Sequence, residues 1–260
     1  ASGKGGVGKS SVTVNLATAM AASGLSVGVV DADIYGHSVP RMLGTDDRPT
    51  QVESMILPPV AHDVKVISIA QFTQGNAPVT WRGPMLHRAL QQFLADVYWG
   101  DLDVLLLDLP PGTGDVAISV AQLIPNAEIL VVTTPQIAAA EVAERAGSIA
   151  LQTRQRVVGV VENMSGLLMP DGSVMQIFGE GGGKQVAERL TQAVGADVPL
   201  LGQVPLDPAL VWAGDTGIPL VLSAPESAAG TELRNIADRL ASRRRGLAGM
   251  SLGLDTARRQ

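Results

Sequence analysis

Short apolar runs alternate with amphipathic stretches along most of this chain. Each run is rich in Val, Ile or Leu and has little polar alternation, which is typical of strands that are buried on both faces of a sheet. The pattern therefore predicts strands at residues 26–30, 64–70, 102–107, 127–134 and 156–162.

Helical periodicity fills the stretches between the predicted strands. Pro84 and Pro135 stand where helices are expected to begin. Gly24, Gly100 and Gly195 stand where helices are expected to end. Strand–helix–strand repetition predicts an α/β fold, with a doubly wound, mostly parallel sheet and helices on both faces, in one domain of residues 1–242. The predicted helices cover residues 10–23, 85–98, 138–152 and 184–194.

The last residues, 243–260, have a different pattern. Three arginines are followed by Gly246, Gly249 and Gly253, with apolar residues between the glycines. One interpretation is an amphipathic helix that lies on a membrane surface. Because each glycine weakens a helix by about 1 kcal/mol relative to alanine, we favour a flexible, solvated tail.

The start of the chain carries the pattern G-x-x-x-x-G-K-[ST], the signature of a phosphate-binding loop. Glycines let such a loop fold tightly, so that its N–H groups and the following helix N-terminus point at phosphate oxygens. Lys9 is placed to neutralise the β and γ oxygens, Ser10 to ligate Mg²⁺, and Ser11 to donate to the α-phosphate. A glycine-rich turn that binds nothing is the alternative, and the helical pattern that follows at once argues against it. The motif comprises Gly3, Lys4, Gly5, Gly6, Val7, Gly8, Lys9 and Ser10.

Three aspartates stand at the ends of predicted strands, where such a nucleotide site needs carboxylates. Asp108 follows the apolar run at 104–107 and is expected to hold Mg²⁺ through water. Asp31 is expected to contact the metal ion more distantly, and Asp33 to orient the attacking water. A single aspartate at a strand end is commonly a turn former or a helix cap, but capping alone does not explain three beside one phosphate loop.

Two further features indicate a nucleotide-driven switch. Lys4 is a second lysine in the loop and marks the deviant Walker A form, in which this lysine reaches the nucleotide of a partner subunit. Lys4 therefore predicts a homodimer across the nucleotide site, although a solvated lysine at the mouth of the loop is the alternative. A rigid turn, residues 110–115, follows Asp108, and the Gly112 N–H is placed to sense the γ-phosphate.

Composition narrows the classes of function. The net charge is −6, with 25 acidic and 19 basic residues, which argues against a general binder of nucleic acid or anionic membranes. There is no cysteine, so these residues supply neither a disulfide nor a thiolate ligand. No apolar run reaches the roughly 18 residues of a membrane span. We therefore expect a cytoplasmic protein without nucleic acid or stable membrane partners.

With these residues the sequence resembles the Mrp/ApbC family of P-loop ATPases, relatives of the cell-division regulator MinD and of the partition ATPases. The resemblance covers nearly the whole chain and implies a MinD-like fold. It implies a homodimer that binds Mg²⁺ and ATP, hydrolyses ATP slowly and carries iron–sulfur clusters to apoproteins, with cluster-assembly proteins as further partners. It also implies that Asn163, Pro205 and Asp207 border the adenine. Beyond the phosphate loop and residues 31–38, it rests on residues 81–85, 108–115, 162–165 and 178–183.

Two departures from the family pattern matter. Members that bind a cluster have Cys-x-x-Cys shortly after Glu-Asn-Met-Ser, where this chain has Met169 and Gly172. A thioether is a poor substitute for a thiolate, so the resemblance carries over the ATPase but not the cluster ligands. His37 replaces the usual proline, and an exposed imidazole is favoured over a metal ligand because His62 and His87 form no ligand spacing with it.

These departures keep two alternatives open. One is an ATP-gated scaffold that no longer holds a cluster. The other is a positioning or partitioning ATPase of the MinD/ParA type, which needs a basic surface or a convincing amphipathic tail. Neither the charge of −6 nor the glycines of the tail supplies one.

The position of the phosphate loop gives a last expectation. Such a loop normally follows a buried strand at the centre of the sheet, and only Ala1 and Ser2 precede Gly3 here. We expect the natural protein to extend N-terminally by at least that strand. By resemblance, a further small domain precedes it.

Overall fold

Two mostly parallel sheets form the centre of the molecule. The computed structural model describes residues 1–33, 36, 38–72, 83–112, 114–136 and 139–243. The first sheet has the order β4-β5-β1-β6, and the second has the order β10-β8-β7 with β9 paired to β8. Only β4 and β9 pair antiparallel to their neighbours in these two sheets. The strands are β1 (Val27–Asp31), β4 (Val60–Ala61), β5 (Val64–Ser68), β6 (Val104–Asp108), β7 (Ile129–Thr133), β8 (Val157–Leu168), β9 (Val174–Met175) and β10 (Leu200–Leu206).

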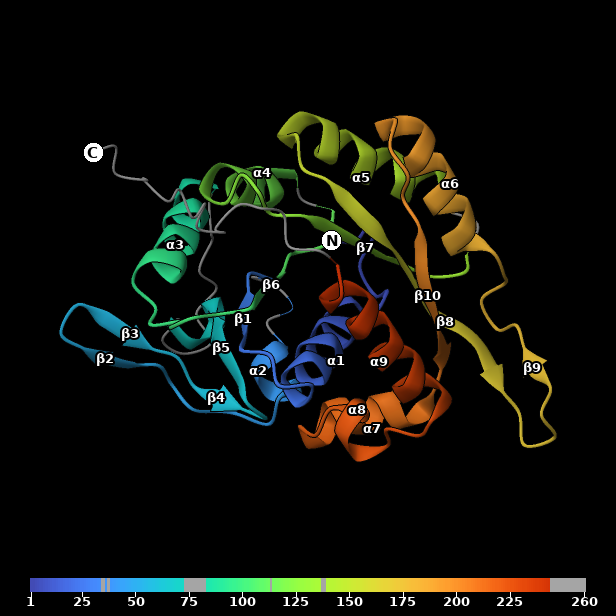
Figure 1. Ribbon diagram of the computed structural model, residues 1–260, viewed down its shortest axis with the longest axis horizontal. Helices are drawn as coiled ribbons and strands as arrows, with labels where there is room; N and C mark the ends of the chain where they lie inside the picture. The colour runs from blue at the N-terminus through green and yellow to red at the C-terminus, as the bar shows by residue number, and fades with distance from the viewer. Residues whose placement is uncertain (34–35, 37, 73–82, 113, 137–138, 244–260) are drawn as a thin grey trace, which may run out of the picture.

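Helices cover both faces of the strands, which confirms the predicted doubly wound α/β fold (Figure 1). One face carries α3 (Gly83–Ala95), α4 (Gly114–Leu123), α5 (Ala139–Thr153) and α6 (Gly182–Val194). The other face carries α1 (Lys9–Ala22), α2 (Val39–Met42), α7 (Pro208–Thr216), α8 (Leu220–Ser223) and α9 (Ala228–Ala241). Among the helices of the described residues, none is long and apolar enough to span a membrane.

Every predicted strand and helix is present in the structure. The predicted and observed bounds differ only at the ends of the elements. The predicted strand at 64–70 ends at Ser68, because Ile69–Phe72 form a 3₁₀ turn, η1. The predicted strand at 156–162 continues to Leu168, since its end pairs with β9. Helix α3 ends at Ala95, well before Gly100, so this glycine is not its terminator. By contrast, Gly195 has a φ of 69° and caps the end of α6 as expected.

Helix α1 runs through the core and carries the phosphate loop at its N-terminus. Most of its residues are buried, because it packs against α9 and against the strands of the first sheet. Its Asn15 is 3% exposed, and Asn15 Oδ1 accepts a hydrogen bond of 3.1 Å from Val221 N. A helix buried all round fixes the position of the loop that precedes it.

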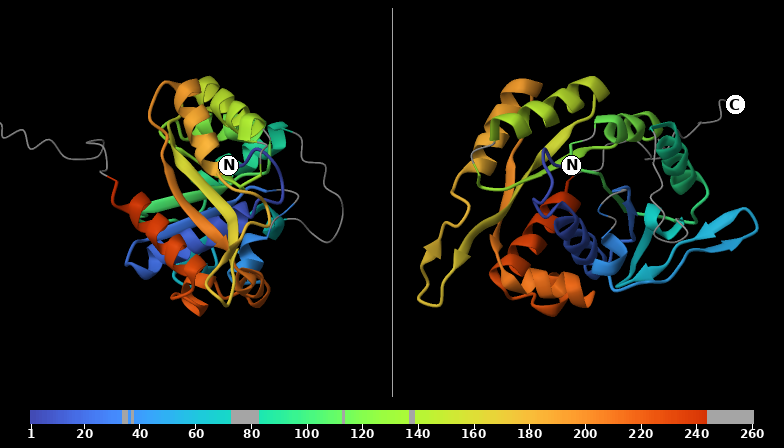
Figure 2. Two further views of the ribbon diagram at one scale, coloured as in Figure 1. Left: turned by 90° about the vertical axis from the view of Figure 1, so that its right-hand side faces the viewer. Right: turned by 180° about the vertical axis from the view of Figure 1, so that it is seen from behind.

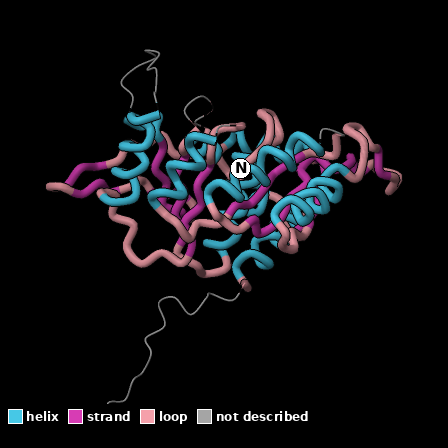
Figure 3. Tube along the Cα trace, turned by 90° about the horizontal axis from the view of Figure 1, so that it is seen from above, coloured by secondary structure: helices cyan, strands magenta, loops and turns pink. Residues whose placement is uncertain are grey.

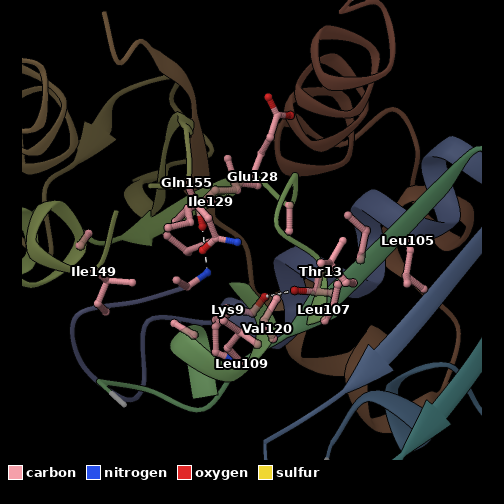
Figure 4. A pocket seen from close by; sticks show the side chains of 18 of the residues that line it. Lys9, Thr13, Leu105, Leu107, Leu109, Val120, Glu128, Ile129, Ile149 and Gln155 are labelled. Carbon is pink, nitrogen blue, oxygen red and sulfur yellow. Dashed lines mark hydrogen bonds between the residues drawn. The ribbon is translucent and has the colours of Figure 1, made fainter. Parts of the chain in front are cut away.

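The two sheets are not joined, unlike the single sheet that the sequence predicts. Neither β6 nor β7 has a strand on its facing edge among the described residues. Ala1 alone pairs there with β7: its N-terminal amine donates to Leu130 O at 2.8 Å, and Val132 N donates to Ala1 O at 2.9 Å. Figure 4 shows the largely apolar side chains around the remaining cavity of about 280 Å³. No strand of the described residues lies between β6 and β7, so the sheet is interrupted there.

Two hairpins project from opposite ends of the molecule (Figures 2 and 3). One consists of β2 (Thr50–Val52) and β3 (Met55–Leu57), and the other is formed by the end of β8 with β9. Both carry exposed apolar side chains, such as Met55 in the first hairpin and Met175 in the second.

Candidate nucleotide site

The phosphate loop wraps a cavity of about 210 Å³ at the N-terminus of α1. Gly8 is the residue before the helix and has a φ of 77°, a left-handed conformation that favours glycine. A Cβ at Gly8 would also collide with the amide nitrogen of Asn163. No side chain of the described residues caps this helix end, so its first N–H groups are available to an anion. The cavity is lined by Ser2, Lys4, Gly5, Gly6, Val7, Gly8, Lys9, Ser10, Ser11, Asp33, Gly36, Ser38, Met42 and Pro111.

Asp108 gathers the polar groups on the inner side of this cavity. Its Oδ1 accepts hydrogen bonds from Lys9 Nζ at 2.6 Å and from Thr13 Oγ1 at 3.1 Å. Its Oδ2 accepts one from Ser10 Oγ at 2.5 Å. Asp108 is 1% exposed and Lys9 is 7% exposed, so each buried charge is compensated by the other. The predicted phosphate lysine and two of the three predicted metal-contacting residues, Ser10 and Asp108, therefore meet at one point.

Asp31 and Asp33 lie next to this group. Parallel pairing of β1 with β6 sets Asp31 directly opposite Asp108. Burial, and then the charge of Asp108, raise the pKa of the Asp31 carboxyl to about 7. Asp33 Oδ2 lies 3.9 Å from Lys9 Nζ, and its Oδ1 accepts a hydrogen bond of 2.9 Å from Gly36 N. Of the three predicted aspartates, Asp33 lines the cavity, Asp108 contacts the lining residues Lys9 and Ser10, and Asp31 lies opposite Asp108.

Lys4 and Gly112 are held by contacts within this chain. Lys4 Nζ donates to Gln136 Oε1 at 2.6 Å on an exposed part of the surface. Gly112 N donates to Ser2 O at 3.2 Å, and Gly112 does not line the phosphate cavity. Its N–H therefore has a backbone partner in this conformation, and its contact to a γ-phosphate stays a prediction. Arg145 Nη1 donates to Gly3 O at 2.8 Å from the outer side of the loop.

A second cavity, of about 340 Å³, lies beside the first and shares Gly8 and Ser11 with it. It contains the three residues expected to border adenine: Asn163, Pro205 and Asp207. Asn163 Nδ2 donates to Val7 O at 2.9 Å. The carboxylate of Asp207 caps α7 by accepting a hydrogen bond of 2.9 Å from Ala209 N. The remaining walls include apolar side chains of Met42, Met164, Leu206, Leu210 and Val211.

The residues present fit Mg²⁺ bound together with a polyphosphate. Ser10 and Asp108 offer the oxygen atoms that this hard cation prefers. No group of three or more acidic or histidine side chains within the described residues forms a metal cage by itself. Mg²⁺ typically keeps several waters and takes further oxygens from substrate phosphates. The hydroxyl of Ser2, a lining residue, is buried without a hydrogen-bond partner among the described residues, so the site holds an unused donor.

The residues present do not fit an iron–sulfur cluster. Met169 and Gly172 lie in the turn between β8 and β9, where Gly172 N donates to Met169 O at 2.9 Å. Neither side chain provides a thiolate, and the chain has no cysteine. The cluster is cargo in the family resemblance, and these residues alone do not ligate it.

Some contacts of the site are not foreseen from the sequence. Thr13 as a donor to Asp108 and Gln136 as the partner of Lys4 carry no motif of their own. The sequence marks Ser2 only by its position directly before the glycine motif, and the burial of its hydroxyl is not predictable from that position. Several predicted positions lie outside the described residues: His37, Thr113, residues 34–35, residues 81–82 of the Trp-Arg-Gly-Pro-Met string and most of the tail.

A phosphate loop ahead of a buried helix, with acidic strand ends across its cavity, is the arrangement of P-loop NTPases, and this chain is of that class. Within the class, it belongs to the family described as ParA: NUBPL iron-transfer P-loop NTPase, which matches residues 1–241. The predicted resemblance to iron–sulfur cluster carriers is thereby confirmed.

Relatives of known name agree with this family. The chain is 84% identical over 259 residues to the iron-sulfur cluster carrier protein of Mycobacterium bovis, which covers all of this chain and 68% of that protein. It is 46% identical over 244 residues to the protein of the same name from Saccharolobus solfataricus, covering 92% of this chain and 80% of the relative.

Solved structures show the same fold. The nucleotide-binding protein from Archaeoglobus fulgidus, in complex with ADP, superimposes with a TM-score of 0.70 at 35% identity and 84% coverage of both chains. The septum site-determining protein MinD from Pyrococcus horikoshii, complexed with Mg-ADP, has a TM-score of 0.67 at 23% identity, covering 95% of this chain and 94% of its own. The second likeness concerns the fold alone.

Proposed function

We propose that this chain binds Mg²⁺ and ATP and hydrolyses ATP to ADP and phosphate as a homodimer. The hydrolysis drives the delivery of iron–sulfur clusters to apoproteins in the cytoplasm. The observation that carries the proposal is that Lys9 and Ser10, which line one small cavity at a helix N-terminus, both donate to the buried carboxylate of Asp108. These groups suit a phosphate chain with its metal ion: the cation and the free helix N–H groups bind phosphate oxygens, and the hydroxyl and the carboxylate bind the metal.

The chemistry assigned to each residue follows from its place. Lys9 neutralises the β and γ oxygens, and the loop N–H groups stabilise the same charge in the transition state. Asp33, on the wall of the cavity, orients the attacking water. Ser10 and Asp108 would hold Mg²⁺, with Asp31 behind them, and the ion would supply further neutralisation of the phosphate charge. Lys4 of the partner subunit completes the site, and Gly112 senses the γ-phosphate once it leaves Ser2.

The adenine end is assigned to the second cavity. Its apolar walls suit a planar base, and Ser11 stands between the two cavities, where it donates to the α-phosphate. Asn163 is held by Val7 O through its nitrogen, which leaves its oxygen as an acceptor for an amino group. Pro205 and Asp207 border the same space.

The carrier role rests on the family and on the names of the relatives. Because this chain has no cysteine, the thiolate ligands of the cluster come from outside these 260 residues. Apoprotein clients and cluster-assembly proteins are the partners that such a carrier requires. Nucleic acid and membranes are not part of the proposal. A scaffold without cargo and a positioning ATPase are not advanced, since no observation favours them.

Two substitutions test the nucleotide chemistry. Lys9→Ala is expected to lower turnover by about 100-fold or more and to weaken ATP binding, because the phosphate charge loses its buried partner. Asp33→Asn is expected to bind ATP and Mg²⁺ normally but to lower single-turnover hydrolysis by about 100-fold or more. Phosphate release and equilibrium binding of a fluorescent ATP analogue measure the two effects separately.

Lys184→Ala is the matched control, because Lys184 is an exposed lysine on α6 whose Nζ lies 4.0 Å from Glu188 Oε1 in an ion pair on the surface. It should behave as the unaltered protein in both assays. Normal single-turnover hydrolysis by Asp33→Asn would remove Asp33 from the chemistry. Absence of Mg²⁺-dependent ATP binding in the unaltered protein would end the proposal itself.

A further inference from the structure

A buried carboxylate outside the phosphate cavity is unexplained by the chemistry above. Glu162 lies in β8 at the centre of the second sheet and is 0% exposed. No lysine, arginine or histidine among the described residues forms an ion pair with it. Burying a carboxylate without a cation is costly unless hydrogen bonds compensate for the lost water. Such a group therefore indicates a role that an apolar side chain does not fill.

Three hydrogen bonds from three segments surround this carboxylate. Oε2 accepts from Gly183 N at 2.5 Å, in the first turn of α6. Oε1 accepts from Gln203 Nε2 of β10 at 2.7 Å and from Ser165 Oγ at 2.8 Å. Helix α6 has Gly181 before its first residue and no side chain of its own as a cap, so Glu162 caps it from a neighbouring strand.

The approach of α6 to Glu162 is close enough to require glycine. A Cβ at Gly183 would lie 2.6 Å from Glu162 Cβ, which is shorter than atoms of folded proteins tolerate. A Cβ at Gly182 would lie 2.6 Å from Pro135 O on the other side. The glycines of the Phe-Gly-Glu-Gly-Gly-Gly string thus let α6 begin directly against the carboxylate.

Strand β8 bends immediately after Glu162. Met164 has a φ of 62°, which is unusual for a residue with a side chain. The register between β8 and β10 shifts in the same place, between Val204 and Leu206. The hydrogen bond from Ser165 to Glu162 closes this bend. A strained bend persists only where surrounding contacts hold it, and Glu162 provides those contacts.

The residue inside this bend belongs to the nucleotide site. Asn163 is 4% exposed, and its amide contacts Val7 O of the phosphate loop on one side and lines the second cavity on the other. We infer that Glu162 is a positioning residue for nucleotide binding, which holds Asn163 against the phosphate loop by tying β8, β10 and the start of α6 together. The inference rests on the proposed nucleotide site and adds a residue that does not touch the nucleotide.

Glu162→Gln tests this role with nearly unchanged volume. Whichever way the new amide turns, its NH₂ group faces either Gly183 N–H or the donors Gln203 and Ser165. The first orientation loses the bond from Gly183 N, and the second requires the side chains of Gln203 and Ser165 to turn so that they accept instead of donate. Both orientations also lose the charge of the carboxylate, so the dissociation constant for ADP is expected to rise about tenfold. Binding of ADP to the whole 260-residue chain, measured by calorimetry, avoids any dependence on hydrolysis.

A double-mutant cycle separates positioning from general destabilisation. If Glu162 acts through Asn163, Glu162→Gln should change the ADP dissociation constant by less than about twofold in an Asn163→Ala background. The full tenfold loss in that background would overturn the inference. Ser165→Ala, a milder change at the same bend, is expected to raise the dissociation constant about threefold and to lose that effect in the Asn163→Ala background.

Val186→Ala is the control for stability. Val186 lies on α6, is 0% exposed and packs in the core cluster that α6 forms with α5, β7 and β8. This variant should lower the thermal midpoint yet leave the ADP dissociation constant within about twofold. Equal ADP binding by Glu162→Gln and the unaltered protein would refute the inference while leaving the proposed function intact. A failure of the unaltered protein to bind ADP would refute the proposed function instead.

Discussion

At the scale of single residues, the carboxylate of Asp108 is fully hydrogen-bonded by side chains of the phosphate loop and helix α1. Lys9, Ser10 and Thr13 all donate to Asp108, which leaves neither carboxylate oxygen of Asp108 without a partner. A metal ion at Asp108 would compete with the ammonium of Lys9 at Oδ1 or with the hydroxyl of Ser10 at Oδ2. Phosphate oxygens would offer Lys9 a new partner, and Mg²⁺ would offer one to Asp108. Nucleotide and Mg²⁺ together would therefore replace the Lys9–Asp108 hydrogen bond, whereas either one alone would replace it for only one of the two residues.

Lys4 gives the first prediction at this scale. It is bound to Gln136 of its own chain at the surface, away from the buried contacts of Lys9. Lys4→Ala is therefore expected to change ATP affinity by less than about threefold but to lower turnover by about 100-fold, since we propose that this lysine acts across a dimer. Steady-state phosphate release and equilibrium ATP binding measure the two parameters.

Mixed dimers decide whether Lys4 acts on its own subunit or on the partner. A dimer of one Lys4→Ala and one Asp33→Asn subunit keeps one intact site only if Lys4 works across the interface. An equimolar mixture of the two inactive proteins should then regain about a quarter of full activity, because half the dimers are mixed and each has one working site. No gain on mixing would place Lys4 in its own site and contradict the proposed arrangement.

At the scale of elements, β8 joins two parts of the molecule. Its first half lies between β7 and β10, and its end leaves the sheet to form the hairpin with β9. The bend at Met164 separates the halves. Asn163, at the candidate nucleotide site, lies in this strand, and Met169, in the hairpin turn, directly follows its last residue, so β8 connects the two places.

The hairpin gives the second prediction. Anaerobic reconstitution of this chain with iron and sulfide is expected to leave no stable cluster, because neither Met169 nor Gly172 is a thiolate. A Met169→Cys, Gly172→Cys variant places two thiolates in the same turn and is expected to retain iron and sulfide as a dimer. Gel filtration followed by iron and sulfide analysis, with the absorbance spectrum, compares the two proteins.

The cysteine variant serves as the positive control for reconstitution. Gly172 has a φ of 83°, so a side chain there introduces strain of about 1–2 kcal/mol in the turn. Near-stoichiometric iron and sulfide in the unaltered chain would contradict the prediction and reveal ligands other than thiolates.

At the scale of the whole molecule, the separation of the two sheets is the main feature. Strands β6 and β7 face each other across a cavity with largely apolar walls, including Leu105, Leu107 and Ile129 (Figure 4). Ala1 takes up two backbone bonds of β7 at one end. Burial, and then the positive charge of Lys9, lower the pKa of the Ala1 ammonium to about 5. A strand in this position would replace the ammonium by an amide and fill the cavity.

The third prediction follows from this cavity. Adding an apolar β-strand of five or six residues ahead of Ala1 is expected to raise the thermal midpoint by at least about 5 °C, since it buries apolar surface and pairs both free edges. An extension of equal length made of glycine and serine is the control. Calorimetry at matched protein and ATP concentrations compares the variants, and equal midpoints would show that a strand is dispensable there.

The sequence by itself determined the features that are local along the chain. The phosphate loop occupies contiguous residues, and apolar runs with Asp31 and Asp108 at their ends predict both the strands and the edge where the site lies. Parallel pairing then brings those aspartates together, because the carboxyl ends of neighbouring parallel strands share one edge. Helix α9 and strand β10 were not predicted, although both are essential parts of the core.

Tertiary structure alone decided the contacts between distant segments. Lys4 meets Gln136, Glu162 meets Gly183, and Asn163 meets Val7, and none of these pairs has a spacing that a pattern reveals. Strand order determines which segments become neighbours, and hydrophobic periodicity carries no information about that order. The bend of β8 and the break between the sheets likewise depend on the neighbours of each strand. Strand pairing is an interaction between segments, so the sequence of one strand does not determine it.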